Sequence, residues 1–165
     1  MGGREPCVRC FDSGPLMTFG RVYPPDVFRK LWSNFHALSK SGRRCAPMEV
    51  LREIEAGDDQ LVRWVRPLEM FRHLDVRQLA VVREVLRQFP SIVDPGKETP
   101  DADPFVVALA RVEGEAKDLY TQTPCVVVTS EKSKPNRVRI PDVCRYYELE
   151  AIDHLEFFRR VRWQF

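Results

Sequence analysis

The stretch Cys125-Val126-Val127-Val128 decides the fold, because small and β-branched apolar residues follow one another there without a polar interruption. Such a run is typical of a strand that is covered on both faces, as in parallel sheets flanked by helices. Residues 7–11 predict a further strand, which the turn-forming residues 12–15 are expected to stop. Residues 151–152 predict a last short strand.

Amphipathic segments separate these short apolar runs. A helix is expected to begin at residues 23–26 and to end at Gly42, because its apolar residues recur at helical spacing. Residues 43–45 are expected to form a short connection, and residues 90–103 the longest loop. Further helices are predicted at residues 47–56, 61–65, 76–89, from 103 onward, at 140–147, and from 153 onward.

Strands that alternate with helices are typical of the α/β class. We therefore expect one domain over residues 1–165, folded as a three-layer α/β/α sandwich. Its central sheet is expected to be mostly parallel, with about four or five strands. The chain has 165 residues, which is long enough to bury a substantial core.

Bulk composition sets few limits on function. The formal net charge is +2, which neither demands nor excludes a polyanionic partner. No apolar run approaches the roughly 18 residues of a membrane span. The first ten residues lack the apolar stretch of a signal peptide. We expect a cytoplasmic protein with no membrane association.

The five cysteines include one C-x2-C pair, formed by Cys7 and Cys10. A structural zinc site needs four ligands, commonly from two such pairs, and the chain has no second pair. We expect free thiols that pack as small apolar side chains, with no disulfide and no zinc. A zinc-stabilised binding protein is the alternative that this pair raises.

Four acidic residues stand at the ends of predicted core elements. Asp12 follows the first strand, Glu53 lies on a helix, Asp103 opens another helix, and Glu131 follows residues 125–128. Mg²⁺ and Mn²⁺ prefer hard oxygen ligands, and α/β sheets bind ligands beyond the carboxyl ends of their strands. We expect the four carboxylates to line one pocket, within roughly 8 Å of a common centre. Their repulsion should raise their proton affinity without metal.

The order of these segments resembles the PIN-domain nucleases, in particular a poorly characterised prokaryotic PIN-like group. The resemblance extends from CFDSGPLM to LEFFRR and includes PMEVLREI, DADPFVVALA and VVVTSEK. It assigns the four acidic positions of the family to Asp12, Glu53, Asp103 and Glu131, with Thr129 beginning the last turn. Two departures are the turn at residues 13–15 and a glutamate at the last acidic position.

The resemblance implies an endoribonuclease that uses Mg²⁺ or Mn²⁺ to hydrolyse RNA phosphodiester bonds without a covalent intermediate. It further implies the toxin of a toxin–antitoxin pair, with RNA and an antitoxin protein as partners. Exposed tyrosine and other aromatic residues raise a homodimer as a separate expectation. The alternative is a catalytically silent PIN-like module that binds nucleic acid or protein.

Substrate binding requires positive charge near the acidic residues. Phosphate contacts of this kind give affinity without sequence choice. A solvated loop is the alternative, because runs of charge usually face water. The expected substrate-binding residues are Arg43, Arg44, Thr129, Lys132 and Lys134, with Arg137 and Arg139 in the same basic segment.

Each acidic residue also has a structural interpretation. Asp103 precedes Pro104 and suits the N-cap of a helix, and Asp12 suits a turn. Glu49 lies one helical turn before Glu53, which makes it a candidate supporting or substitute ligand. The remaining two are Asp142, a helix start and peripheral site candidate, and Asp153, the cap of the last helix, with Glu156 completing a capping box.

Overall fold

A computed structural model describes residues 8–115 and 124–165 of the chain. Within them, five strands form one sheet in the order β3-β2-β1-β4-β5, and every neighbouring pair is parallel. This confirms the predicted α/β class and its parallel sheet. The strands are β1 (Val8–Phe11), β2 (Arg44–Pro47), β3 (Phe71–Arg72), β4 (Cys125–Val128) and β5 (Glu150–Ile152).

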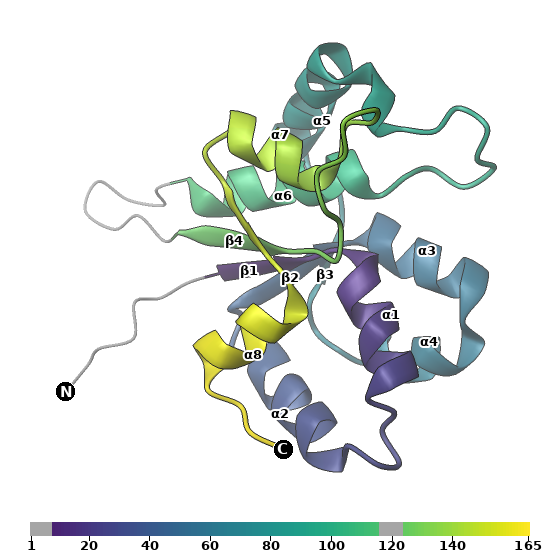
Figure 1. Ribbon diagram of the computed structural model, residues 1–165, viewed down its shortest axis with the longest axis vertical. Coiled ribbons are helices and arrows are strands. Elements are labelled where there is room, and N and C mark those ends of the chain that lie inside the picture. The colour runs from purple at the N-terminus through teal and green to yellow at the C-terminus, as the bar shows by residue number, and fades with distance from the viewer. Residues whose placement is uncertain (1–7, 116–123) are drawn as a thin grey trace.

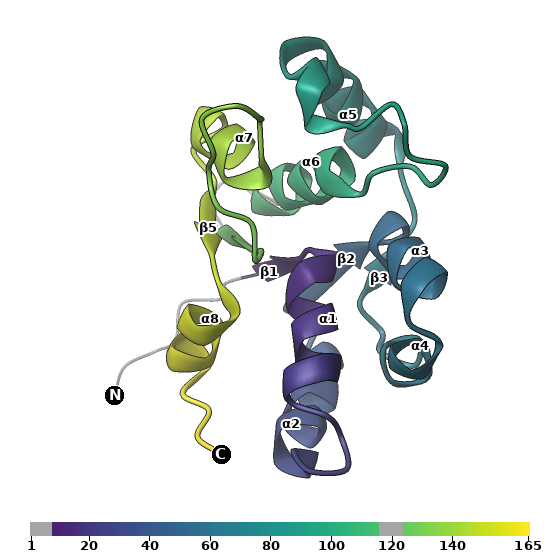
Figure 2. The ribbon, with the colours of Figure 1, turned by 45° about the vertical axis from the view of Figure 1, so that its right-hand side comes forward.

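Helices cover both faces of the sheet and complete the three layers (Figures 1 and 2). One face carries α5 (Val76–Gln88), α6 (Asp103–Gly114) and α7 (Ile140–Tyr146), with the short η1 (Pro90–Ile92) after α5. The other face carries α1 (Ser13–Val22), α2 (Arg29–Ser39) and α8 (His154–Val161). On the β2–β3 side follow α3 (Met48–Gly57), which contacts both of those strands, and α4 (Asp59–Val65).

The two faces of β1 carry buried side chains of different kinds, a thiol on one face and an aromatic ring on the other. Cys10 faces α6, and its thiol donates to the carbonyl oxygen of Val106 at 3.5 Å. Phe11 faces the other layer, where its ring packs edge-to-face against Phe35 and Phe157 with centroids 5.4 and 5.1 Å apart. Burial on both faces is what a central strand of a parallel sheet requires.

The central strand β1 marks the point where the strand order reverses direction. β2 and β3 lie on one side of it, and β4 and β5 on the other. β1 and β4 end level with each other, because Phe11 pairs with Val128 and the Asp12 amide donates to the Val128 carbonyl at 3.0 Å. Open α/β sheets bind ligands in the crevice at such a reversal. The residues that follow β1 and β4 therefore flank the expected ligand position.

The prediction for residues 12–28 was wrong in two places. Residues 12–15 do not form a free turn but begin α1, with Asp12 at its N-cap and Pro15 in its first turn. Proline fits there because the first amides of a helix have no intrahelical acceptor. α2 begins at Arg29 rather than at residues 23–26, since Pro24 accepts from two following amides and closes a turn instead.

Residues 43–45 were also assigned wrongly. They do not form a mere connection, because β2 begins at Arg44 and pairs with β1 through Cys10 and Cys45. β3 adds a further short strand on its other side, with Ala46 opposite Phe71. The other predicted helices and strands are present, with ends shifted by one or two residues.

Four of the five cysteines lie in the described part of the chain, and all four are free and buried. They are Cys10, Cys45, Cys125 and Cys144. Cys7, the other half of the C-x2-C pair, lies outside the described residues. Across residues 8–115 and 124–165, no helix has the length and apolar character needed to cross a membrane.

Candidate functional site

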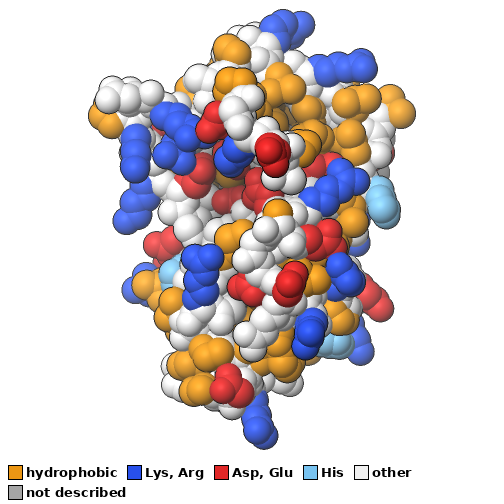
Figure 3. All heavy atoms as spheres, turned by 90° about the vertical axis from the view of Figure 1, so that its right-hand side faces the viewer, with side chains coloured by type: hydrophobic (Ala, Val, Ile, Leu, Met, Phe, Trp, Pro, Cys, Tyr) orange, Lys and Arg blue, Asp and Glu red, His pale blue; other side chains and the backbone are white. Residues whose placement is uncertain are grey.

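The four predicted acidic residues line one pocket of about 510 Å³ at the carboxyl ends of β1 and β4. Figure 3 views the face where acidic side chains gather in a hollow, with basic side chains on both sides. The residues come from the start of α1, the middle of α3, the start of α6 and the segment after β4. The pocket carboxylates are Asp12, Glu53, Asp103 and Glu131.

Asp12 is held rigidly at the floor of the pocket and is only 4% exposed. Its Oδ1 accepts the Ser13 amide at 2.7 Å, and its Oδ2 accepts the Thr129 hydroxyl at 3.0 Å. Burial, and then the charge of Glu131, raise the pKa of Asp12 to about 7, although both hydrogen bonds act in the opposite direction. The protein therefore holds a carboxylate where a negative charge is unfavourable.

Thr129 was predicted to bind substrate, and the structure places it outside the residues that line the acidic pocket. It is 3% exposed. Its hydroxyl donates to Asp12, and its oxygen accepts the Glu131 amide at 3.1 Å. Thr129 therefore positions two pocket residues relative to each other, because it joins the end of β4 to the end of β1.

Asp103 differs from the other three carboxylates because, among the described residues, no hydrogen bond or ion pair engages its side chain. It is the first residue of α6, and Ala102 occupies the N-cap, so the predicted capping role of Asp103 was wrong. Burial raises the pKa of Asp103 to about 8, followed by the charges of Glu131, Asp12 and Glu53. A half-buried carboxylate without a partner, surrounded by other carboxylates, is favoured in its protonated form unless a cation compensates its charge.

Glu53 connects three helices at the pocket. From α3, its Oε2 accepts the Ser13 hydroxyl at 2.6 Å, and its Oε1 accepts the Ala102 amide at 3.0 Å. These donors lie at the beginnings of α1 and α6. Glu49, the alternative on the same helix, does not line the pocket; it pairs with Arg52 at 3.5 Å, and its buried Oε2 has no partner among the described residues.

Glu131 is bound to the beginning of α7. Its Oε2 accepts the Ile140 amide at 2.9 Å, and its Oε1 contacts Arg139 Nη1 at 3.2 Å. Asp142 caps the same helix by accepting the Arg139 amide at 2.9 Å and the Ser133 hydroxyl at 2.6 Å. These contacts lower the pKa of Asp142, the Ser133 hydroxyl most strongly. Asp142 lies outside the acidic pocket and serves as a helix start.

The beginnings of three helices meet at this pocket. α1, α6 and α7 each place their first residues beside one of the four carboxylates. The amino end of a helix carries unpaired amides and a partial positive charge, which stabilise nearby carboxylates. This arrangement offsets part of the repulsion among the four acidic side chains.

Positive side chains surround the acids, as the sequence predicts for the segment after Glu131. A further cation, Lys97, comes from the loop before α6, where it pairs with the buried Asp101. That hydrogen bond raises the pKa of Lys97. The sequence did not indicate Lys97 as a site residue, because its loop has no periodic pattern. The pocket cations are Lys97, Lys132, Lys134, Arg137 and Arg139.

Arg44 and Arg43 were expected to bind substrate, and the structure places both elsewhere. Arg44 is fully buried under the opposite face of the sheet, with its guanidinium carbon 4.4 Å from the Phe35 ring centroid and 5.1 Å from that of Phe157. Burial, and then Arg9, lower its pKa. Arg43 precedes β2 and therefore lies at the amino ends of the strands, the edge opposite the pocket.

The fold and the site together define an α/β domain with a carboxylate pocket, ringed by basic side chains, at the reversal of its strand order. The chain belongs to the family described as Domain of unknown function (DUF4411), which matches residues 10–165. No curated protein matches the chain. The matched range contains all four pocket carboxylates, so the pocket lies within the family's common domain.

Proposed function

We propose that the pocket binds Mg²⁺ or Mn²⁺ and that the protein hydrolyses RNA phosphodiester bonds as an endoribonuclease. The observation that carries the proposal is Asp103, a carboxylate without a partner among the described residues and with a pKa raised to about 8. It lies in a pocket that also holds three other carboxylates and a rim of Lys and Arg. Carboxylate oxygens suit these ions, and basic side chains suit a polyanion.

The donor set fits a divalent ion held by Asp12 and Asp103, with Glu53 and Glu131 as further ligands. In residues 8–115 and 124–165, no group of three or more acidic, His or Cys side chains is placed so that it could hold a metal ion as it stands. Binding therefore requires a shift of the carboxylates, whose oxygens retain unused lone pairs beside their present hydrogen bonds. When bound, such an ion stabilises charge on a phosphodiester and lowers the pKa of an attacking water.

The basic rim supports RNA as the substrate. Lys132, Lys134 and Arg137 line the pocket and are exposed or half-buried, so they are available to phosphates. Arg139 is engaged by Glu131 and fixes that carboxylate. None of the described residues that line the pocket is aromatic, so base stacking has no platform there. Recognition by phosphate contacts predicts cleavage with little sequence preference.

The resemblance to PIN-domain nucleases supplies the cellular part of the proposal. In this proposal the protein is the toxin of a toxin–antitoxin pair, and an antitoxin protein covers the pocket. Self-association into a homodimer belongs to the same proposal. Expression of the unmutated chain should then arrest growth, and expression of the Asp103→Asn variant should not.

The test of the enzymatic activity is cleavage of a mixed single-stranded RNA pool with Mg²⁺, with Mn²⁺ and with chelator. Outer contacts of metal sites commonly contribute 10–100-fold, so loss of a ligand in Asp12→Asn or Asp103→Asn should reduce cleavage by more than about 100-fold. Asp59→Asn, an exposed position in the first turn of α4, is the matched control and should keep the unmutated rate. Full activity of both pocket variants, or cleavage that resists chelator, would refute this assignment.

A silent binding module is the second candidate, and one observation favours it. Three of the four carboxylates already have hydrogen-bond partners, and the described residues contain no finished metal group. This alternative predicts RNA binding that is independent of divalent ions, with no cleavage by the unmutated protein. The same assay, read as binding and as cleavage, separates the two candidates.

A further inference from the structure

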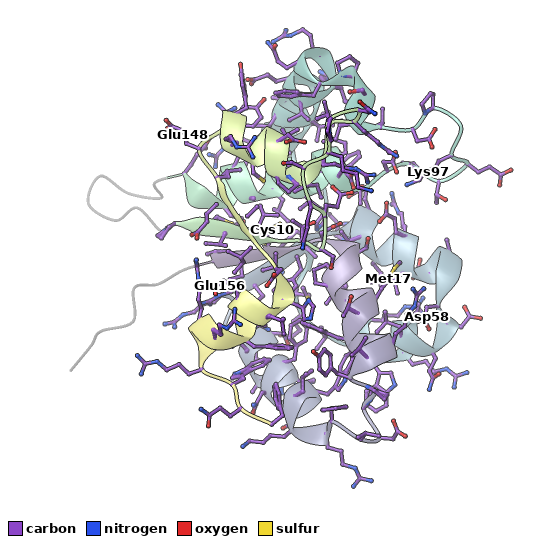
Figure 4. All side chains as sticks on the ribbon, viewed as in Figure 1. Cys10, Met17, Asp58, Lys97, Glu148 and Glu156 are labelled. Atoms are coloured by element: carbon purple, nitrogen blue, oxygen red, sulfur yellow. The ribbon has the colours of Figure 1, made fainter. Side chains whose placement is uncertain are left out.

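The cations of the pocket approach it from two sides. Four of them, at residues 132–139, belong to the connection between β4 and α7. Lys97 belongs to the loop before α6, on the side of Glu53 and α3, whose strand neighbours are β2 and β3. Asp12 follows the strand that separates these two sides. Figures 2 and 4 show the two segments apart, with Lys97 labelled on its loop.

The loop that carries Lys97 is built around acidic side chains. Asp101 is 5% exposed, and its Oδ2 accepts the Asp94 amide at 2.6 Å. Asp94 in turn accepts the Gly96 amide at 2.9 Å through its side chain and the Lys97 amide at 3.2 Å through its carbonyl. These hydrogen bonds connect Asp94 to Asp101 and to the backbone of residues 96 and 97. The backbone of Lys97 is therefore fixed at the edge of the pocket, and its side chain can still change conformation.

The side chain of Lys97 is free to exchange its partner. It is 51% exposed, and its one ion pair within the described part of the chain is with Asp101. Only the lysine end of this pair is exposed, because the Asp101 side chain is 2% exposed. Asp101 would keep the Asp94 amide after Lys97 leaves. The phosphate that receives the ammonium must offset the ion pair that the buried Asp101 loses.

We propose that Lys97 binds the substrate phosphate on the opposite side of the cleaved bond from the phosphates bound by residues 132–139. This inference rests on the proposed nuclease function and assigns the path of the RNA across the protein surface. The RNA crosses the carboxylates as a continuous single strand, from the Lys97 loop to the β4–α7 connection. The site accordingly requires at least one phosphate on each side of the bond and takes internal bonds rather than chain ends.

The test maps phosphate contacts one at a time. A short single-stranded RNA with a mapped cleavage position is made with a single uncharged methylphosphonate at each linkage in turn. Binding is measured with Ca²⁺ in place of Mg²⁺, over a range of salt. In the unmutated protein, neutral linkages on both sides of the bond should weaken binding. In Lys97→Met, the neutral linkage at one position on one side of the bond should no longer weaken binding. In Lys134→Met, the same should hold for a linkage on the other side.

The salt dependence gives an independent readout. Loss of one phosphate contact to a single strand should reduce the slope of log K against log salt by about 0.7. Lys97→Arg should restore the slope and the linkage pattern, whereas Lys30→Met, at an exposed position of α2, should change neither. A merely structural Lys97 would lower the melting temperature of Lys97→Met and leave the linkage pattern unchanged.

The outcomes are distinct. An unchanged pattern in Lys97→Met, or a lost linkage on the same side as in Lys134→Met, overturns the assignment of Lys97 while the nuclease function stands. No RNA binding and no cleavage by the unmutated protein overturns both proposals. Restored binding by Lys97→Arg together with loss of one specific linkage in Lys97→Met supports the path.

Discussion

Asp103 is the residue at which stability and the proposed activity oppose each other. Its pKa is raised from 3.8 to about 8 by burial and by the neighbouring carboxylates. Between these two values the folded protein holds a proton that the unfolded chain has released. Stability from this group is therefore full below about pH 4 and is lost as the pH rises through about 8.

Replacement of Asp103 by Asn should stabilise the metal-free protein at alkaline pH, because the amide keeps the shape and removes the unfavourable charge. We expect a gain on the order of 1–2 kcal/mol at pH 8.5, or a rise in melting temperature of a few degrees. The difference should shrink toward pH 5. Thermal melting across this range measures it, with Asp59→Asn as the control. Equal melting curves for the two proteins at every pH would contradict the raised pKa.

Arg44 shows that a charged residue in a sequence is not a reliable sign of a surface position. Its Nε and one Nη have no partner among the described residues, and its Nη1 donates weakly to the Phe35 carbonyl at 3.4 Å. The aromatic rings around it supply cation–π contacts and pack against its aliphatic stem. Nothing in the residue pattern distinguishes this arginine from its exposed neighbour Arg43.

We expect Arg44→Met to leave the free energy of unfolding within about 1 kcal/mol of the unmutated value, because methionine keeps the apolar volume and removes a buried charge. Arg44→Ala should cost about 2–5 kcal/mol, since it leaves a cavity between Phe35 and Phe157. Urea denaturation measures both, and RNA affinity should be unchanged in the Met variant. A large loss in Arg44→Met would instead show that the cation–π contacts outweigh desolvation.

At the scale of elements, the pocket depends on how helices begin. Glu53 joins the beginnings of α1 and α6 to α3. Its two donors are Ser13 and Ala102, the sequence neighbours of Asp12 and Asp103, so Glu53 helps to position both carboxylates. This makes its role different from that of Asp103, although both carboxylates line the same pocket. Glu53 therefore stabilises the pocket, whereas the charged form of Asp103 is unfavourable there.

Removal of Glu53 should therefore lower stability, opposite in sign to the Asp103 variant. Glu53→Ala leaves the Ser13 hydroxyl and the Ala102 amide without their acceptor, at a cost of about 1–3 kcal/mol. Glu53→Gln should have a free energy of unfolding between those of the unmutated protein and Glu53→Ala, because the glutamine side chain retains one carbonyl oxygen. Glu55→Ala, exposed on the same helix, serves as the control with a change within about 0.5 kcal/mol. Denaturant unfolding at pH 7 measures all three, and a stable Glu53→Ala would refute this linking role.

The elements that sequence reasoning missed were short or began with unusual residues. α1 starts at Ser13-Gly14-Pro15, which reads as a chain break until the N-cap of Asp12 is considered. β2 has four residues but begins with Arg44 and ends with Pro47, and β3 has only two, so neither shows a distinctive apolar pattern. The longer amphipathic helices were predictable because their periodicity extends over enough residues to be distinctive. β4 is as short as β2 but was predictable because all four of its residues are apolar.

At the scale of the whole molecule, the pocket should link divalent ions to global stability. An ion that binds only the folded state at 100 times its dissociation constant adds about 2.7 kcal/mol, or roughly 2–4 °C for each kcal/mol in a chain of this size. Mn²⁺ or Mg²⁺ should raise the melting temperature of the unmutated protein, more at pH 8 than at pH 6, because protons compete for Asp12 and Asp103.

Sodium chloride at matched ionic strength should not reproduce this stabilisation, and Asp103→Asn should lose most of it. The measurement is a melting temperature at increasing ion concentration, with chelator to reverse the effect. An unmutated protein whose melting temperature ignores both ions at millimolar concentration would contradict a metal site and would favour the binding module.

The proximity of Asp12 and Glu131 was predictable because parallel strands end at a common edge, which places the residues after β1 and β4 side by side. The supporting contacts were not predictable. The sequence indicated Thr129 but not its contacts with Asp12 and Glu131, and Lys97 with Asp101 lies in a loop whose shape depends on hydrogen bonds between residues seven apart. Such contacts follow from three-dimensional packing and leave no periodic trace in the chain.

The strand order has a consequence for the synthesis of the protein. The central β1 is made first, but its neighbour β4 begins at Cys125, and the last pocket residue, Arg139, comes later still. Ribosomes release the chain from its amino end, so the acidic residues at 12 and 131 cannot meet until the segment between them has emerged. A nascent chain shorter than this carries no assembled pocket, and the proposed nuclease would become active only after residue 139 has left the RNA-rich machine that makes it.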